Sequence, residues 1–119
     1  MKYSESLKKN KDFQYIYRKG TSYANKYLVM YVLENGTGQN RLGISVSKKV
    51  GNSVVRHRVT RLIRESYRLN ERSFRQGLDI VVVAGPNAKD KSYQEIESAL
   101  MHLAGRMKIR REAELHVED

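Results

Sequence analysis

Apolar residues recur at the i, i+3, i+4 spacing of an amphipathic helix in three stretches of the chain. The first covers residues 11–19, with Asn10 as a candidate N-cap and Gly20 as a stop signal. The second runs from about 53 to 70. The third follows Ser92, the first residue of a Ser-x-x-Glu capping box, and carries apolar residues along one face. The pattern therefore predicts one short helix and two longer ones.

Four other stretches have the composition of β-strands. Residues 20–24 form a short candidate, and the aromatic and aliphatic run 27–33 predicts a strand that is at least partly covered on both faces. After a turn at 35–40, residues 41–47 alternate between apolar and small side chains, which predicts an antiparallel partner strand. The run 79–84 predicts a central, buried strand. The expected order is α-β-β-β-α-β-α. Because neither a repeat nor a linker interrupts it, we predict one α+β domain over residues 1–119.

Composition narrows the possible functions. The 119 residues are 39% hydrophobic, enough for one small core, and contain no cysteine, which excludes a disulfide scaffold, a cysteine zinc or iron–sulfur site and a cysteine nucleophile. No apolar run approaches the roughly 20 residues of a membrane span, so we expect a cytoplasmic protein without a membrane partner. The 23 Lys and Arg outnumber the 13 Asp and Glu, and the net charge of +10 favours a polyanionic partner.

The charge is concentrated in one window. Residues 41–75 hold ten basic and two acidic side chains, which is +8 of the total of +10. A concentrated window indicates a binding surface better than a uniformly basic chain does. The last fourteen residues, 106–119, hold four basic and four acidic side chains, so we expect a neutral, frayed tail from about residue 108.

Most of this charge falls on the predicted helix 53–70. On a helical wheel, one side gathers a set that we expect to face the core: Val55, Val59, Leu62, Ser66 and Leu69, with Ile63 at its margin. The opposite side gathers His57, Arg61, Arg64 and Arg68, while Arg56 and Arg58 flank the apolar stripe. Like charges at this spacing repel one another, and arginine forms bidentate contacts with phosphate. The helix therefore predicts nucleic-acid binding and leaves the choice between RNA and DNA open.

A long continuous motif overlaps this helix. It is RLGISVSKKVGNSVVRHRVTRLIRE at residues 41–65, with shorter matches at 7–13, 20–25 and 79–88. Together these segments resemble the protein subunit of bacterial ribonuclease P. The resemblance implies an RNA-based endonuclease that removes the 5′ leader from precursor tRNA. In that family the RNA subunit performs the chemistry with magnesium, and the protein binds the catalytic RNA and the leader. The resemblance also implies a mixed sheet with a left-handed β-α-β crossover, no catalytic residue in this chain and no metal bound by this chain alone.

The resemblance assigns roles by position. The residues expected to face the catalytic RNA are Lys48, Lys49, Arg56, His57, Arg58, Arg61, Arg64 and Arg68. The cleft expected to hold the leader is lined by Phe13, Tyr17, Val29 and Tyr31. Two positions depart from the family pattern, with His57 in place of asparagine and Thr60 in place of lysine. Thr60 removes one phosphate contact.

Other interpretations remain open. Phe13 and Tyr17 share the apolar face of a short helix, where two aromatic residues are commonly part of the core. A ribosomal or other structural RNA-binding protein also fits the basic helix, and a DNA-binding module fits it less well. A nuclease acting alone requires clustered carboxylates or paired histidines, and this sequence has neither pattern.

Overall fold

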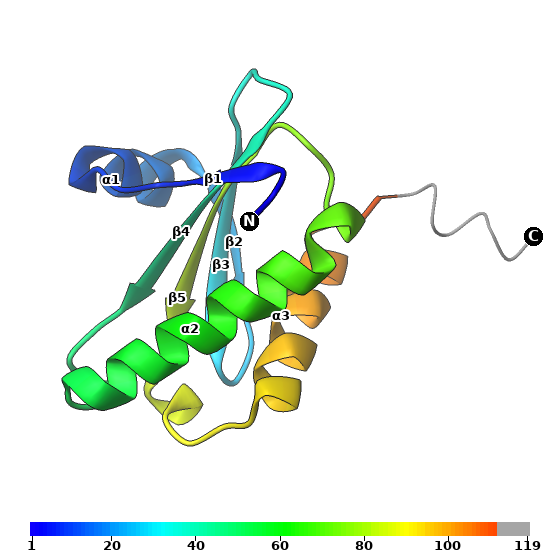
Figure 1. The fold of residues 1–119 in the computed structure, drawn as a ribbon. Helices are drawn as coiled ribbons and strands as arrows, with labels where there is room; N and C mark the ends of the chain where they lie inside the picture. Colours follow the sequence, from blue (N-terminus) through cyan, green and yellow to red (C-terminus); the bar gives the residue numbers. More distant parts are fainter. Residues whose placement is uncertain (112–119) are drawn as a thin grey trace, which may run out of the picture.

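The computed structural model describes residues 1–111. Its elements follow one another along the chain (Figure 1) as β1 (Ser4–Ser6), α1 (Asn10–Lys19), β2 (Thr21–Ala24), β3 (Leu28–Glu34), β4 (Asn40–Val46), α2 (Ser53–Asn70), the 3-10 turn η1 (Glu71–Ser73), β5 (Leu78–Ala84), the 3-10 turn η2 (Pro86–Ala88) and α3 (Tyr93–Arg106). The predicted α+β class and order are confirmed, with β1 as an additional short strand that the polar N-terminal sequence did not indicate.

The strands form one five-stranded mixed sheet in the order β1-β4-β5-β3-β2. β5 lies at its centre, parallel to β4 and antiparallel to β3, as its apolar sequence predicts. The prediction that residues 41–47 form an antiparallel partner strand is wrong, because β5 separates β4 from β3 and β4 is parallel to both of its neighbours. β5 takes the central position because its side chains are apolar on both faces and need cover from two layers.

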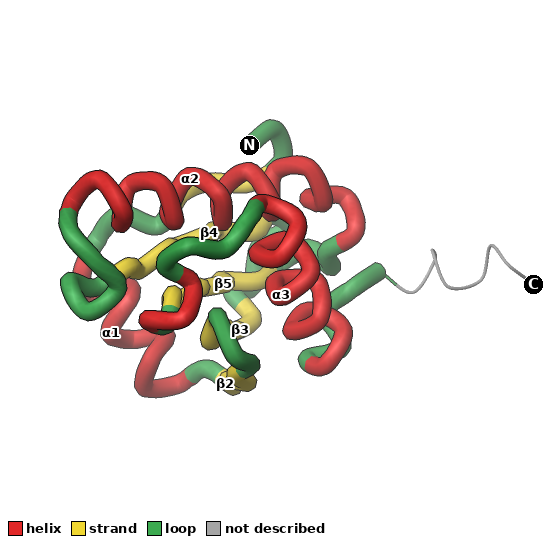
Figure 2. The backbone as a smooth tube through the Cα atoms, turned by 90° about the horizontal axis from the view of Figure 1, so that it is seen from below, coloured by secondary structure: helices red, strands yellow, loops and turns green. Residues whose placement is uncertain are grey.

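The helices cover the two faces of the sheet unequally. α2 and α3 pack on one face and α1 packs on the other (Figure 2). α2 connects the parallel neighbours β4 and β5 across its face, and the two views show that this crossover is left-handed, as the resemblance implied. This handedness is an exception among β-α-β units. No helix within residues 1–111 combines the length and apolarity of a membrane span.

The main core lies between the sheet and the helices α2 and α3. α2 contributes Val59, Ile63 and Tyr67, all fully buried, together with Ser66. The buried side of α2 is therefore rotated from the predicted one, because Leu69 is 57% exposed and Tyr67 is buried in its place. The Tyr67 hydroxyl hydrogen-bonds Ser4 Oγ at 2.8 Å and accepts from Asn40 Nδ2 at 3.3 Å, so its burial leaves no polar atom unsatisfied.

Of the three predicted cap and stop signals, Asn10, Gly20 and Ser92, the last two agree with the structure. α3 begins with the predicted capping box, in which Ser92 Oγ accepts from the backbone N–H of Glu95 and the Glu95 carboxylate accepts from that of Ser92. α1 stops before Gly20, whose Cβ, if it had one, would lie 2.7 Å from the carbonyl oxygen of Ile16. Asn10 is not the N-cap of α1, because Lys9 takes that position without a side-chain hydrogen bond and Asn10 is the first helical residue.

The segment after α3 returns to the body of the protein. Lys108 adopts a left-handed φ of 59°, Ile109 is buried, and Arg110 forms a β-bridge with Phe74. These residues belong to the stretch for which the sequence suggests a frayed tail, and here they are packed. The rest of that stretch, 112–119, lies outside the described residues.

Candidate nucleic-acid interface

The exposed face of α2 carries basic side chains along most of its length. They are His57, Arg58, Arg61, Arg64 and Arg68, all of which are exposed. Two exposed apolar residues stand near the ends of this face, Val54 at 76% and Leu69 at 57% exposure. The structure thus brings together five of the eight residues expected to face RNA. We call them the basic face of α2.

The members of the basic face differ in how far their charge is already paired. Arg68 donates two hydrogen bonds to the Glu65 carboxylate, at 2.9 and 2.6 Å. The hydrogen bond from Arg68 lowers the pKa of Glu65, and the same bond raises the pKa of Arg68. By contrast, the side chains of His57, Arg61 and Arg64 make no hydrogen bond or ion pair with any group of residues 1–111. Their donors are available to a partner.

Arg58, the remaining member of the basic face, and Arg56, which flanks it, lie against other parts of the fold. Arg58 donates to the backbone oxygen of Lys91 at 2.9 Å, which ties α2 to the loop before α3. Arg56 is only partly exposed, and its buried Nε has no hydrogen-bond partner within the described chain. Thr60, where the resemblance implies lysine, donates its hydroxyl to the backbone oxygen of Arg56 at 2.9 Å. The substitution is therefore accommodated within the helix itself.

The lysines expected to face RNA lie in the turn between β4 and α2. Lys48 and Lys49 are exposed, whereas the next residue, Val50, is buried and anchors the turn. The backbone N–H of Val50 donates to the carbonyl of Ser47 at 3.1 Å, and Asn52 caps α2 by accepting from the backbone N–H of Val55 at 3.0 Å. The turn is thus a fixed platform that presents both lysines beside the first turn of α2.

The opposite face of the sheet carries the aromatic residues. The ring of Tyr17 from α1 packs edge-on against the ring of Tyr31 from β3, with 4.9 Å between the ring centres. The centre of the Phe13 ring lies 6.4 Å from that of Tyr17. Val29 is two residues from Tyr31 on the same side of β3, in register with Val83 of β5. These four residues, which we call the aromatic face, were all predicted at the leader-binding position. All four are partly exposed rather than fully buried.

Two features that sequence reasoning missed hold α1 against this face. Gly43 of β4 lies under the Phe13 ring, because a Cβ there would be 2.7 Å from Phe13 Cζ. Arg41 of β4 donates two hydrogen bonds to Asp79 of β5, at 2.8 and 2.6 Å, and lies 3.8 Å from Asp12 of α1. Burial of the Asp79 carboxyl raises its pKa, but the hydrogen bonds from Arg41 and Asn35 outweigh this and hold the pKa below its ordinary value. Only the packing reveals either contact, since Gly43 and Arg41 read in the sequence as ordinary strand residues.

The basic face of α2 and the aromatic face therefore lie on opposite sides of one sheet. In both views, α1 and the N-terminal end of α2 extend to the same side of the molecule, and in Figure 1 β4 ends towards the N-terminal end of α2 (Figure 1, Figure 2). Within residues 1–111, no group of three or more His, Asp or Glu side chains gathers as candidate metal ligands.

Comparison with known proteins identifies the family. A family model described as Ribonuclease P matches residues 1–108. The chain belongs to the ribonuclease P protein family. Accordingly, it is the protein subunit of ribonuclease P, a tRNA-processing ribonucleoprotein endonuclease, and the ribonuclease P RNA is its partner. The interpretation as a ribosomal or other structural RNA-binding protein is not favoured.

Close relatives share nearly the whole length of the chain. The ribonuclease P protein component of Lachnoclostridium phytofermentans is 65% identical over 106 residues, 89% of this chain and 91% of the relative. That of Alkaliphilus metalliredigens is 55% identical, covering 92% of this chain and 98% of the relative.

Solved structures share the fold. The ribonuclease P protein of Staphylococcus aureus superposes with a TM-score of 0.83 at 40% identity, over 91% of this chain and 99% of the other. That of Thermotoga maritima gives a TM-score of 0.79 at 31% identity, over 86% and 96% of the two chains. The five-stranded sheet with helices on both faces is thus the fold of the ribonuclease P protein family.

Proposed function

We propose that this subunit binds the catalytic RNA of ribonuclease P through the basic face of α2, Arg56, Lys48 and Lys49, and binds the single-stranded leader of precursor tRNA on the aromatic face. The observation that carries the first part is the pair Arg61 and Arg64, whose guanidinium groups are exposed and unpaired within residues 1–111. Such groups form bidentate contacts with phosphate oxygens.

The aromatic face suits a ligand of variable sequence. Bases stack on aromatic rings with about 1–3 kcal/mol each, whatever their identity. Tyr17 and Tyr31 present partly exposed rings, and the register of the sheet places Ala24 and Ser22, both small, beside Val29 and Tyr31. A single strand can therefore approach the rings without crossing large side chains. Magnesium, in this proposal, is held by the RNA subunit in the assembled enzyme in the cytoplasm, and this chain supplies binding and orientation only.

The RNA contact of α2 is tested with two substitutions at neighbouring positions, one that removes a positive charge and one that removes a negative charge. Arg64→Ala removes one unpaired cation, so the slope of log affinity for the catalytic RNA against log salt is expected to flatten by about 0.7–0.9. Glu65→Gln removes the negative charge that is paired with Arg68 and one of the two oxygens that accept from it, so it is expected to tighten binding and steepen the slope. Salt titrations of the purified subunit with the RNA measure both.

The opposite signs separate contact from folding. The exposed pair between Arg68 and Glu65 contributes little to stability, so both variants are expected to unfold within a few degrees of the unmodified protein. A folding defect weakens binding in both variants. Unchanged salt slopes in both would contradict the assignment of α2 to RNA.

The leader contact is tested by Tyr31→Leu in the assembled enzyme. Because Tyr31 lies on the aromatic face, we expect the preference for precursor tRNA over mature tRNA to fall about fivefold or more, the equivalent of losing roughly 1 kcal/mol of stacking. The matched control is Tyr23→Leu, which alters a tyrosine of β2 that contacts Arg106 at the other side of the sheet. An equal loss of affinity for both RNAs in Tyr31→Leu would mean a damaged fold instead of a lost leader contact.

A further inference from the structure

Basic side chains from three segments that are distant in the sequence meet around the 3-10 turn η1. They are Lys2, Arg72, Arg75, Lys108, Arg110 and Arg111, and all six are exposed. We call this group the η1 surface. In Figure 1 the last turn of α2 and the start of the C-terminal segment lie together at the right of the molecule. The sequence conceals this cluster, because four acidic residues balance the basic ones within 106–119.

Backbone contacts fix the C-terminal segment beside η1. The N–H of Arg75 donates to the carbonyl of Ile109 at 2.6 Å, and the N–H of Arg111 donates to the carbonyl of Ser73 at 2.8 Å. Between them, Phe74 and Arg110 form a β-bridge. This short ladder keeps the basic residues of the two segments close together, with Arg72 and Arg111 lining one pocket and Arg75 and Lys108 lining another.

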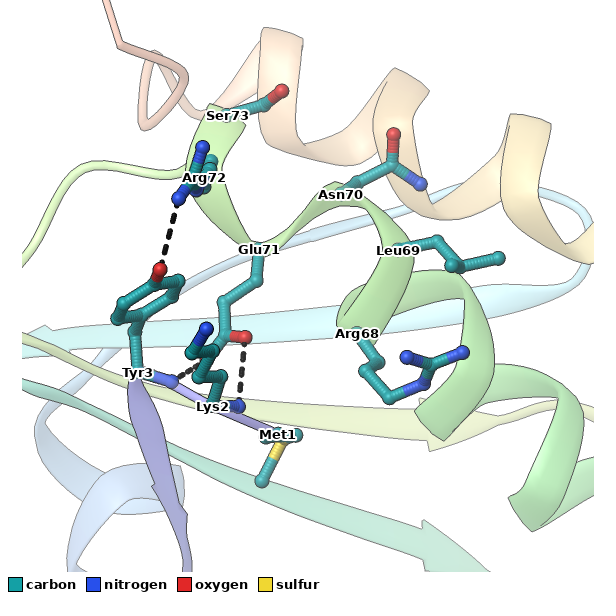
Figure 3. A pocket seen from close by; sticks show the side chains of 9 residues that line it. All are labelled: Met1, Lys2, Tyr3, Arg68, Leu69, Asn70, Glu71, Arg72 and Ser73. Carbon is teal, nitrogen blue, oxygen red and sulfur yellow. Dashed lines mark hydrogen bonds between the residues drawn. The ribbon is translucent and has the colours of Figure 1, made fainter.

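The N-terminus adds to the same surface, at an open pocket of about 500 Å³ (Figure 3). The Glu71 carboxylate accepts hydrogen bonds from the backbone N–H groups of Lys2 and Tyr3, at 3.1 and 2.9 Å. Arg72 donates to the Tyr3 hydroxyl at 2.9 Å and stands 5.4 Å from the centre of its ring. Because Glu71 is buried and its carboxylate accepts both bonds, it holds the residues just before β1 against η1.

Some of these cations also hold the fold together. Arg111 donates to the carbonyl of Arg72 at 3.3 Å, and Arg75 lies 3.4 Å from both the Lys108 carbonyl and the Glu34 carboxylate. Structural contacts do not account for Lys108 and Arg110, whose side chains make no hydrogen bond or ion pair with residues 1–111. A purely structural role for this surface does not explain these two positive charges, because they repel the other basic side chains around η1.

We propose that the η1 surface is a second RNA-binding surface, which contacts phosphates of the catalytic RNA beyond the end of α2. The inference rests on the proposed function of α2, because the two surfaces are continuous: Arg68 of α2 and Arg72 of η1 line the same pocket. The 18 residues of α2 span about 27 Å, so an RNA that follows the helix arrives at η1 after several phosphates. The catalytic RNA is preferred to the leader as the ligand, because the aromatic face is on the other side of the sheet.

The test uses the double variant Lys108→Gln with Arg110→Gln, which removes two charges that no side chain of residues 1–111 pairs. We expect the salt slope for binding the catalytic RNA to flatten by about 1.4–1.8, so that the ratio of unmodified to variant affinity falls roughly ninefold between 50 and 200 mM salt. The control is the double variant Lys19→Gln with Lys26→Gln, which removes the same charge from exposed positions away from η1. Thermal unfolding of both variants shows whether the fold is intact.

The possible outcomes distinguish the proposal for the η1 surface from the proposed function of α2. A flatter slope for Lys108→Gln with Arg110→Gln and an unchanged slope for the control support the η1 surface. Equal slopes in both double variants overturn it, and so does a change confined to precursor tRNA in the assembled enzyme. If the η1 variant keeps its slope while Arg64→Ala flattens, the second surface is wrong and the function of α2 stands. If Arg64→Ala also keeps its slope, the proposed function itself fails.

Discussion

A methyl group added at Gly43 is expected to disturb the aromatic face from below. An ideal Cβ at this position would lie 2.7 Å from Phe13 Cζ, 2.8 Å from Phe13 Cε2 and 3.2 Å from Leu7 Cβ. Ordinary contact begins at 3.4 Å, so the Phe13 ring must retreat by about 0.7 Å, and Leu7 closes the opposite route for the methyl group. Such overpacking costs about 1–3 kcal/mol, against which alanine gains about 0.5–1 kcal/mol over glycine within a strand.

We therefore expect Gly43→Ala to lower the free energy of unfolding by about 1–2 kcal/mol, as measured by urea denaturation. The source of the loss is tested in the background of Phe13→Leu, which lacks Cζ and Cε2, the two ring atoms nearest to Gly43. There the same change is expected to cost at least about 1 kcal/mol less, a coupling typical of residues in contact. If Gly43→Ala stabilises the protein equally in both backgrounds, the close approach of Phe13 to Gly43 is wrong.

The displaced ring also has a functional consequence. In the assembled enzyme, Gly43→Ala is expected to reduce the preference for precursor tRNA over mature tRNA, because Phe13 belongs to the aromatic face. Its affinity for the catalytic RNA alone is expected to stay unchanged, because α2 rests on the other side of the sheet. A loss confined to the catalytic RNA would refute this division of the two faces.

Two further predictions concern stability. Because the pKa of the Asp79 carboxyl is lowered in the folded protein, its ion pair with Arg41 stabilises the fold above about pH 4, and this contribution is lost as the pH falls through the lowered pKa. Urea midpoints measured from pH 7 to 2 should therefore fall less steeply for Asp79→Asn, and parallel curves would contradict this. Ser92→Ala removes the capping box and is expected to cost about 1 kcal/mol, whereas Ser98→Ala, an exposed change within the same helix, is expected to cost nothing. Similar losses in both would show that the cap contributes little.

Strong local signals predicted most elements of the fold. The capping box at Ser92 and the apolar run of β5 each depend on a few adjacent residues, and both are confirmed. Which strands lie side by side in the sheet, by contrast, is not determined by residues adjacent in the sequence. The turn at 35–40 suggested a hairpin between β3 and β4, but the strand that needs cover on both faces enters between them from a distant part of the chain. The short strand β1 escaped prediction because distant partners hold its polar sequence in place: β1 pairs with β4, and Glu71 accepts hydrogen bonds from the backbone of Lys2 and Tyr3 just before it.

The orientation of α2 shows the same limit. Apolar spacing placed Leu69 in the core, but Tyr67 is buried instead. Burial of a tyrosine hydroxyl requires hydrogen-bond partners, and these are Ser4, 63 positions away, and Asn40, 27 positions away. A helical wheel shows only residues of the same helix, so it cannot show these distant hydrogen-bond partners. The basic residues that were predicted to be exposed still lie on the surface, because the buried side of α2 differs from the predicted side by only a small rotation about the helix axis.

The strand β4 explains why the two proposed contacts can be separated by mutation. Its side chains alternate, so that Leu42 and Ile44 pack towards α2, while Gly43 and Ser45 belong to the side of α1. A substitution on one side of β4 therefore affects the surface on that side directly. It affects the surface on the other side only through the sheet backbone, in which β4 is held by the central strand β5. Loss of leader preference with intact binding of the catalytic RNA, or the reverse, identifies a contact residue. Loss of both identifies damage to the sheet that the two surfaces share.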